Sequence, residues 1–95
     1  MSICKCDEPL SIFLFVAART LDNIGARNWN FASDLVEKLE EQLGVLEKFL
    51  GKELPVTGAS VRRAKEDVKK KLPYTASANL DTAILWVIRE ACGSV

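Results

Sequence analysis

The sequence predicts an all-α protein that folds as a four-helix, mostly antiparallel bundle. Apolar residues recur at three- and four-residue spacing in four segments, as on the inner face of a helix. Turn-forming residues separate these segments, and the short connections favour antiparallel neighbours. The period-two alternation and the Asn-Gly or Asp-Gly turns that are typical of hairpins are both absent. A chain of 95 residues suffices for one domain but not two, so we expect residues 1–95 to form a single domain.

The first two predicted helices cover the first half of the chain. Segment 8–26 follows Asp7, a residue type that caps helix N-termini. Segment 31–50 ends at Gly51, because glycine readily adopts the left-handed conformation that stops a helix. Its apolar positions alternate at three- and four-residue spacing, as in a bundle helix. They are Val36, Leu39, Leu43, Leu46 and Leu50.

The third predicted helix follows a proline-containing loop over residues 51–58. We expect it to begin near Gly58, with the side chain of Thr57 or Ser60 as its N-cap. It must end before Pro73, because the residue that precedes a proline is disfavoured in the helical conformation.

The fourth predicted helix is capped by Ser77 and runs to Cys92, where a glycine follows. Each of the four helices then offers one apolar stripe to a shared core. We predict that the core contains Phe13, Leu14, Leu21, Leu39, Leu43, Leu46, Val61, Val68, Ile84 and Ile88.

Charge and composition limit the functions that are open to this chain. Lys and Arg total 13 and Asp and Glu total 13, so the net charge is zero. The overall positive charge typical of nucleic-acid or acidic-membrane binding is therefore missing. The chain has no histidine, which removes the usual general base and the commonest transition-metal ligand. No glycine-rich phosphate-binding motif occurs either. We expect no enzymatic activity, no cofactor and no bound metal.

The cysteines and the apolar runs bear on the cellular location. Cys4, Cys6 and Cys92 are too few for a disulfide scaffold, and we interpret them as free thiols in the reducing cytoplasm. A disulfide or a soft metal ion at the chain ends is the alternative, because an up-down bundle brings those ends together. The longest apolar run, residues 10–18, is shorter than the roughly 20 residues of a membrane span. Acidic residues precede it, where a signal peptide would carry positive charge. We therefore predict a cytoplasmic protein that does not bind membranes.

Two of the predicted helices carry apolar residues on a second face. These residues are Ile12, Phe15 and Val16 in the first helix, with Leu85 and Trp86 in the last. The first and last helices of an up-down bundle are neighbours, so the residues would merge into one patch, and monomers rarely expose large apolar patches. The pattern predicts a homo-oligomer, most simply a two-fold dimer, that acts as a binding or scaffolding module for a further protein partner. The alternative is an irregular bundle that encloses these residues.

A second functional hypothesis concerns the basic helix 60–72, which has six Lys or Arg and two acidic residues. Three of the basic side chains project together and could follow a phosphate backbone, while the preceding turn would direct backbone N–H groups at an anion. Against this, acidic partners lie four residues away, an acidic helix precedes, and no aromatic residue interleaves the run to stack on bases. Nucleic-acid or phosphate binding is therefore the alternative function. The residues involved would be Thr57, Ser60, Arg62, Lys65 and Lys69.

The corner between the first two helices contains two aromatic residues. Trp29 and Phe31 flank Asn30, a residue type that caps helices. We interpret the pair as hydrophobic packing across the corner rather than as a ligand clamp.

Overall fold

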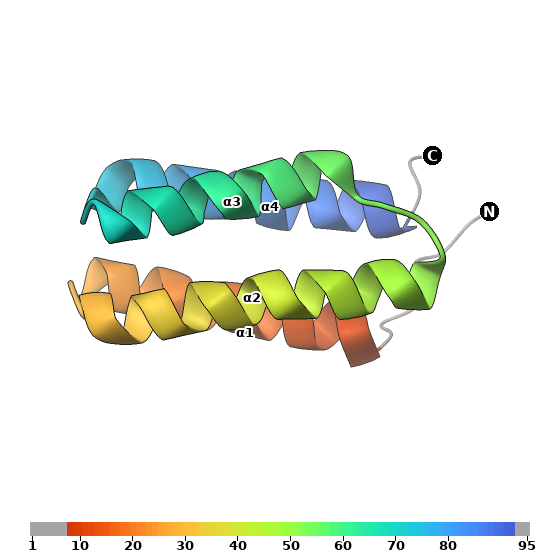
Figure 1. The fold of residues 1–95 in the computed structure, drawn as a ribbon, viewed down its shortest axis with the longest axis horizontal. Coiled ribbons are helices and arrows are strands. Elements are labelled where there is room, and N and C mark those ends of the chain that lie inside the picture. Colours follow the sequence, from red (N-terminus) through yellow and green to blue (C-terminus); the bar gives the residue numbers. More distant parts are fainter. Residues whose placement is uncertain (1–7, 93–95) are drawn as a thin grey trace.

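The structure is an up-down-up-down bundle of four helices (Figure 1). This computed structural model describes residues 8–92, so the predicted cap Asp7 lies outside the described residues. No strand occurs in the described part of the chain. The predicted all-α, four-helix, mostly antiparallel fold is confirmed. Its helices are α1 (Glu8–Gly25), α2 (Trp29–Leu50), α3 (Pro55–Lys69) and α4 (Pro73–Cys92).

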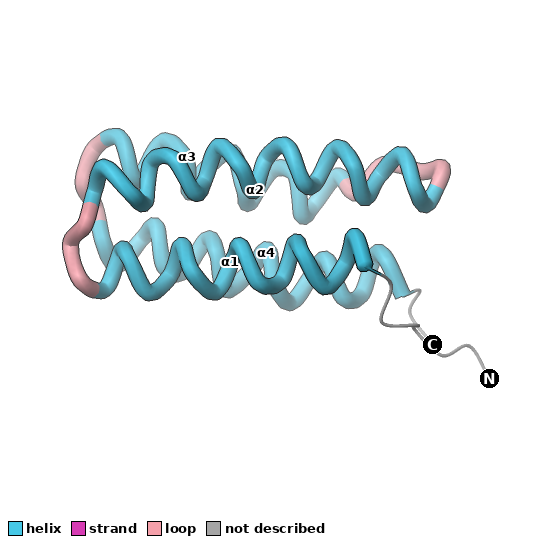
Figure 2. Tube along the Cα trace, turned by 90° about the horizontal axis from the view of Figure 1, so that it is seen from below, coloured by secondary structure: helices cyan, strands magenta, loops and turns pink. Residues whose placement is uncertain are grey.

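The four helices form two layers, α1 with α2 and α3 with α4 (Figure 1). Contacts of α2 with α3 and of α1 with α4 join the two layers, so each helix packs against two neighbours. Short loops at the two ends of the bundle reverse the chain direction each time (Figure 2). Consequently α1 and α4 are adjacent, as predicted, and α1 begins at the end of the bundle where α4 finishes.

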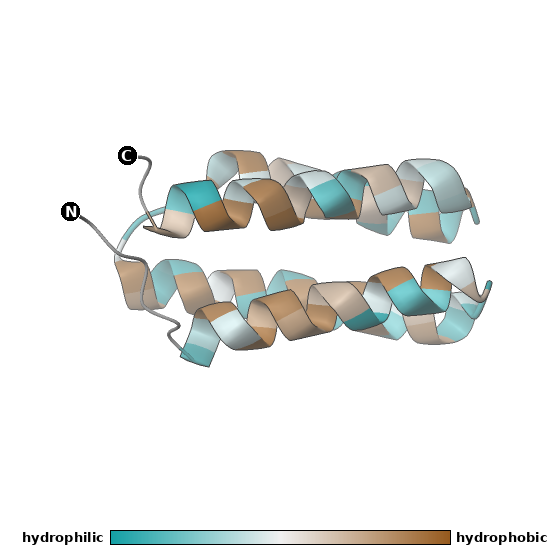
Figure 3. Cartoon of the chain, turned by 180° about the vertical axis from the view of Figure 1, so that it is seen from behind, coloured by the Kyte–Doolittle hydropathy of each residue, from teal (hydrophilic) through white to brown (hydrophobic). Residues whose placement is uncertain are grey.

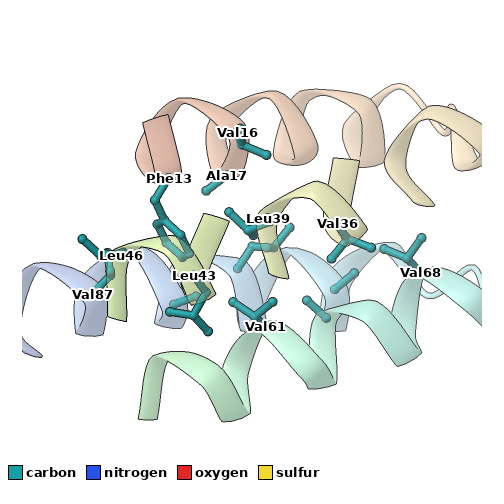
Figure 4. Packing of buried hydrophobic residues seen from close by; sticks show 14 of the residues in the cluster. Phe13, Val16, Ala17, Val36, Leu39, Leu43, Leu46, Val61, Val68 and Val87 are labelled. Carbon is teal, nitrogen blue, oxygen red and sulfur yellow. The ribbon is translucent and has the colours of Figure 1, made fainter. Parts of the chain in front are cut away.

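The core is made of one apolar stripe from each helix (Figure 4). The prediction is confirmed for the fully buried or nearly buried members Phe13, Leu39, Leu43, Leu46, Val61 and Val68. Three other predicted members pack against this core while staying partly exposed, and they are Leu14, Leu21 and Ile84.

The prediction for Ile88 is wrong, because its side chain is 44% exposed. The preceding residue, Val87, is fully buried and takes the core position. Successive helical residues point about 100° apart, and Val87 lies on the same inward side of α4 as the buried Leu80 and Ala83. The next residue, Ile88, therefore points away from the core.

Three helices begin earlier than the sequence predicts. Helix α2 begins at Trp29, two residues before the predicted start, and the other two begin at a proline. Helix α3 begins at Pro55, and α4 begins at Pro73 rather than after a cap at Ser77. Proline suits a first helical position, because its fixed φ is close to the helical value and its missing N–H would have no partner there. Thr57 and Ser60 therefore lie inside α3, where both are buried. Neither forms the predicted N-cap.

Gly51 ends α2, as predicted. Its φ of 69° places it in the left-handed region. The Gly51 N–H donates to the carbonyl oxygen of Glu47 at 2.9 Å, and the N–H of Lys52 donates to the same oxygen at 3.2 Å. The Gly51 N–H also lies 3.3 Å from the carbonyl oxygen of Lys48, so the carbonyl groups of Glu47 and Lys48 both have a partner at the end of the helix.

Alanine substitutions at two glycines of α2 are expected to change stability in opposite directions. Gly51→Ala should lower the free energy of unfolding by about 1–2 kcal/mol, because a Cβ atom is unfavourable at positive φ. Gly44→Ala should raise it by about 0.5–1 kcal/mol, because Gly44 lies inside the helix and its added Cβ meets no atom within 4 Å. Urea denaturation followed by circular dichroism measures both changes. Shifts of the same sign would contradict this description of α2.

The described end of α4 carries Cys92, which is disulfide-bonded. The prediction of free thiols is therefore wrong for Cys92, while Cys4 and Cys6 lie outside the described residues. Disulfides persist in oxidising compartments, so Cys92 does not support the predicted cytoplasmic location. Across residues 8–92, no helix combines the length and the hydropathy of a membrane span.

Candidate interaction surface

The structure places three of the five predicted interface residues at the surface. Ile12, Phe15 and Leu85 are all exposed, with Phe15 at 66%. Hydrophobic residues accordingly appear on the viewer's side of α1 and α4 in Figure 3. Val16 is only 7% exposed and belongs to the core, so its prediction as an interface residue is wrong. It lies three residues after the fully buried Phe13, and residues at this spacing share one side of a helix.

Trp86, the fifth predicted interface residue, lies on the side of α4 that faces α3. It shares a helix face with Asn79 and Glu90, which lie seven residues before it and four after it. Both of these residues form hydrogen bonds to side chains of α3. The half-buried ring of Trp86 also has the Arg89 guanidinium carbon 5.3 Å from its centroid, which is cation–π geometry. The predicted single patch that includes Trp86 is therefore not formed.

Several exposed apolar residues were not assigned to an interface from the sequence, and three of them lie on α2. The others are Val56, Leu72, Tyr74 and Ile88, on α3, the α3–α4 connection and α4. Phe31 is 66% exposed, Phe49 is 58% exposed, and Val45 is also exposed. The corner prediction is thus right for Trp29, which packs against the core, and wrong for Phe31. The exposure of Phe31, Val45 and Phe49 could have been predicted from the sequence, because all three residues fall outside the inward apolar stripe of α2.

The exposed apolar residues of α1 and α2 lie on the same side of the molecule. Arg19 of α1 lines one surface groove together with Phe31, Leu35 and Lys38 of α2. Ile12 and Phe15 lie seven and four residues before Arg19, so they continue its helix face. Val45 and Phe49 continue the face of Phe31 and Lys38 along α2. We call this surface the α1–α2 face, and its exposed apolar residues are Ile12, Phe15, Phe31, Val45 and Phe49.

The N-terminus of α3 is not open to an anion from solution, because a carboxylate of the same chain already occupies it. The backbone N–H groups of Val56 and Thr57 donate to the Glu90 carboxylate at 3.2 and 2.9 Å. The Thr57 hydroxyl donates to the same Glu90 oxygen, Oε1, at 2.6 Å. Negative charge at a helix N-terminus is favourable, and here the end of α4 supplies it. Ser60 is buried in the bundle and is not available to an anion in solution.

The predicted phosphate-binding side chains of α3 do not form one cluster of positive charges open to solvent. Lys65 Nζ donates to Glu40 Oε1 of α2 at 2.9 Å. The hydrogen bond to Glu40 and then its negative charge raise the pKa of Lys65 above the ordinary value. Lys69 Nζ lies 3.8 Å from the Glu66 carboxylate. Arg62 is exposed, in a groove that also contains Glu66 and Asp67. Two of the three predicted phosphate-binding cations thus already contact carboxylates.

Among residues 8–92, no group of three Cys, Asp or Glu side chains is arranged to hold a metal ion. In the same part of the chain, every buried side-chain nitrogen or oxygen has a hydrogen-bond partner. Comparisons of this chain with known protein families, with curated proteins and with solved structures gave no match. The function is therefore inferred from the geometry of this chain alone.

Proposed function

We propose that this protein is a non-enzymatic helical-bundle module that works as a homo-oligomer, most simply a dimer, in binding or scaffolding. The supporting observation is the α1–α2 face, where three phenylalanines are each more than half exposed. Together they offer roughly 300–450 Å² of apolar surface, given about 150–250 Å² for a whole aromatic side chain. This area is spread along the face, with Lys38 and Gln42 between the two phenylalanines of α2. Exposed apolar surface of this extent on a monomer is often a functional contact surface, and two-fold pairing is the commonest way to bury it.

The polar side chains support a non-enzymatic role. Catalytic acids and bases usually combine a shifted pKa with a position in a pocket. The pKa of Lys65 is raised, and its surface hydrogen bond and ion pair with Glu40 account for this without a catalytic role. Glu90 and Asp67, which face neighbouring helices, accept hydrogen bonds that hold α3 and α4 together.

Sedimentation equilibrium tests the proposed homo-oligomer directly. At tens of micromolar, we expect a mass of about twice the 10.5 kDa of one chain. Phe15→Glu should shift the protein toward monomer with its helicity retained, because the exposed Phe15 side chain adds little to the core. Ala78→Glu is the matched control, since it adds the same charge at an exposed position of α4.

A wild-type protein that sediments as a monomer throughout this concentration range would overturn the proposal. Equal weakening by Phe15→Glu and Ala78→Glu would show that added negative charge, rather than loss of the aromatic contact, explains the effect. That result would contradict a role for Phe15.

A further inference from the structure

Six residues of α2 belong to the α1–α2 face, and the spacing between them is the same whether the helix is followed from its N-terminus or from its C-terminus. Their positions lie alternately four and three residues apart, with a phenylalanine at each end and polar residues at the centre. In order, they are Phe31, Leu35, Lys38, Gln42, Val45 and Phe49. Such a stripe can pair with an antiparallel copy of itself, so that each phenylalanine meets the phenylalanine from the opposite end.

Exposed charges beside this stripe distinguish the two possible directions of pairing. Asp34, Glu41 and Lys48 are all exposed and lie seven residues apart on the outer edge of α2. Antiparallel pairing brings Asp34 next to Lys48 of the partner subunit, twice in the dimer. The same register brings Glu41 next to the partner's Glu41, with Lys38 of each subunit beside these two carboxylates. Parallel pairing in register would oppose Lys38 to the partner's Lys38, and like charges at close range are unfavourable. The two Asp34–Lys48 contacts therefore favour the antiparallel arrangement.

Helix α1 fits the same two-fold axis. Arg19 of α1 lies level with Leu35 of α2, since both line one groove. The two helices are antiparallel, so Phe15, four residues before Arg19, lies level with the residue about four after Leu35. That level is the centre of the α2 stripe. An axis through this centre would also bring Phe15 close to the partner's Phe15.

We propose that a second copy of this chain docks on the α1–α2 face, with α2 antiparallel to the partner's α2. Phe31 then packs on the partner's Phe49, and Asp34 pairs with the partner's Lys48. The pairing is closed, because a two-fold contact uses the same surface of both subunits and leaves no second copy of it free. This inference depends on the proposed function, since it requires that the protein self-associates.

Two variants, each with one charge reversed, test the pairing when they are measured separately and as a mixture. Lys48→Glu alone should raise the dimer dissociation constant about tenfold, because two Asp34–Glu contacts replace two attractive pairs. Asp34→Lys alone should weaken the dimer similarly through two contacts between lysines. A mixture of the two variants should form a heterodimer of nearly wild-type affinity, because both cross-subunit contacts are then attractive again. Sedimentation equilibrium of each variant and of the mixture measures the three constants.

Circular dichroism of the separate variants is the control for folding, because both positions are exposed and should leave the helicity unchanged. Restored association in the mixture would support antiparallel α2 pairing, since parallel pairing does not bring position 34 to position 48. A wild-type dimer that neither variant weakens would overturn this inference and leave the homo-oligomer standing. A monomeric wild-type protein would overturn both.

Discussion

Phe13→Ala is expected to lower the free energy of unfolding by about 3–5 kcal/mol. Phe13 is fully buried and points from α1 into the space between the helices (Figure 4). Truncation removes its apolar contacts and leaves a cavity that the surrounding helices fill only in part. Small domains have a total stability of about 5–15 kcal/mol, so the variant should be partly unfolded well below the wild-type melting temperature. Urea denaturation followed by circular dichroism measures the change.

Phe15→Ala is the matched control, because it makes the same truncation two residues later in the same helix. Phe15 is largely exposed, so the expected change is within about 0.5 kcal/mol. Both variants should be measured at a protein concentration low enough that self-association does not contribute. Comparable losses at the two positions would contradict the orientation of α1 in this structure.

The fold was predictable because the signals for helices and for their ends are local. Three- and four-residue apolar spacing identified four helices, and Gly51 stops α2 as its conformational freedom implies. The starts of α3 and α4 were predicted too late, because Pro55 and Pro73 were treated as helix breakers. At the first position of a helix the same residue is favourable, so its effect depends on where the helix begins.

The orientation of a helix with two apolar faces was less predictable. Val87 and Ile88 are adjacent and both apolar, so spacing alone fits either residue to the core. Val16 raises the same ambiguity in α1. Contacts with two neighbouring helices determine which side faces inward, and these contacts join residues far apart in the chain. The exposed phenylalanines of α2 were missed because that helix has a complete inward stripe of its own.

The occupant of the α3 N-terminus was not predictable from the sequence. An anion was expected at Thr57, and the structure supplies one from Glu90, which lies 33 residues further along the chain. No local pattern identifies such a pair, because it depends on how α3 and α4 pack together.

Glu90→Ala is the second substitution with a large expected effect, a loss of about 2–3 kcal/mol in the free energy of unfolding. The Glu90 carboxylate accepts hydrogen bonds from two backbone N–H groups and from the Thr57 hydroxyl, at 2.6 to 3.2 Å. Thr57 is fully buried, so water does not readily replace the lost acceptor. Urea denaturation measures the loss. Asp81→Ala, at an exposed position of the same helix, should change stability by less than about 0.5 kcal/mol.

A double-mutant cycle with Thr57→Val isolates the contribution of the hydroxyl. Valine keeps the shape of threonine and the backbone N–H, but it has no hydroxyl group that requires an acceptor. Glu90→Ala should therefore cost about 1 kcal/mol less in the Thr57→Val protein than in the wild type, because no buried hydroxyl is left without a partner. Equal costs in both proteins would show that the bond from Thr57 Oγ1 to Glu90 does not stabilise the packing of α3 on α4. Attachment of α3 would then depend on the apolar stripe that contains Val61, Ala64 and Val68.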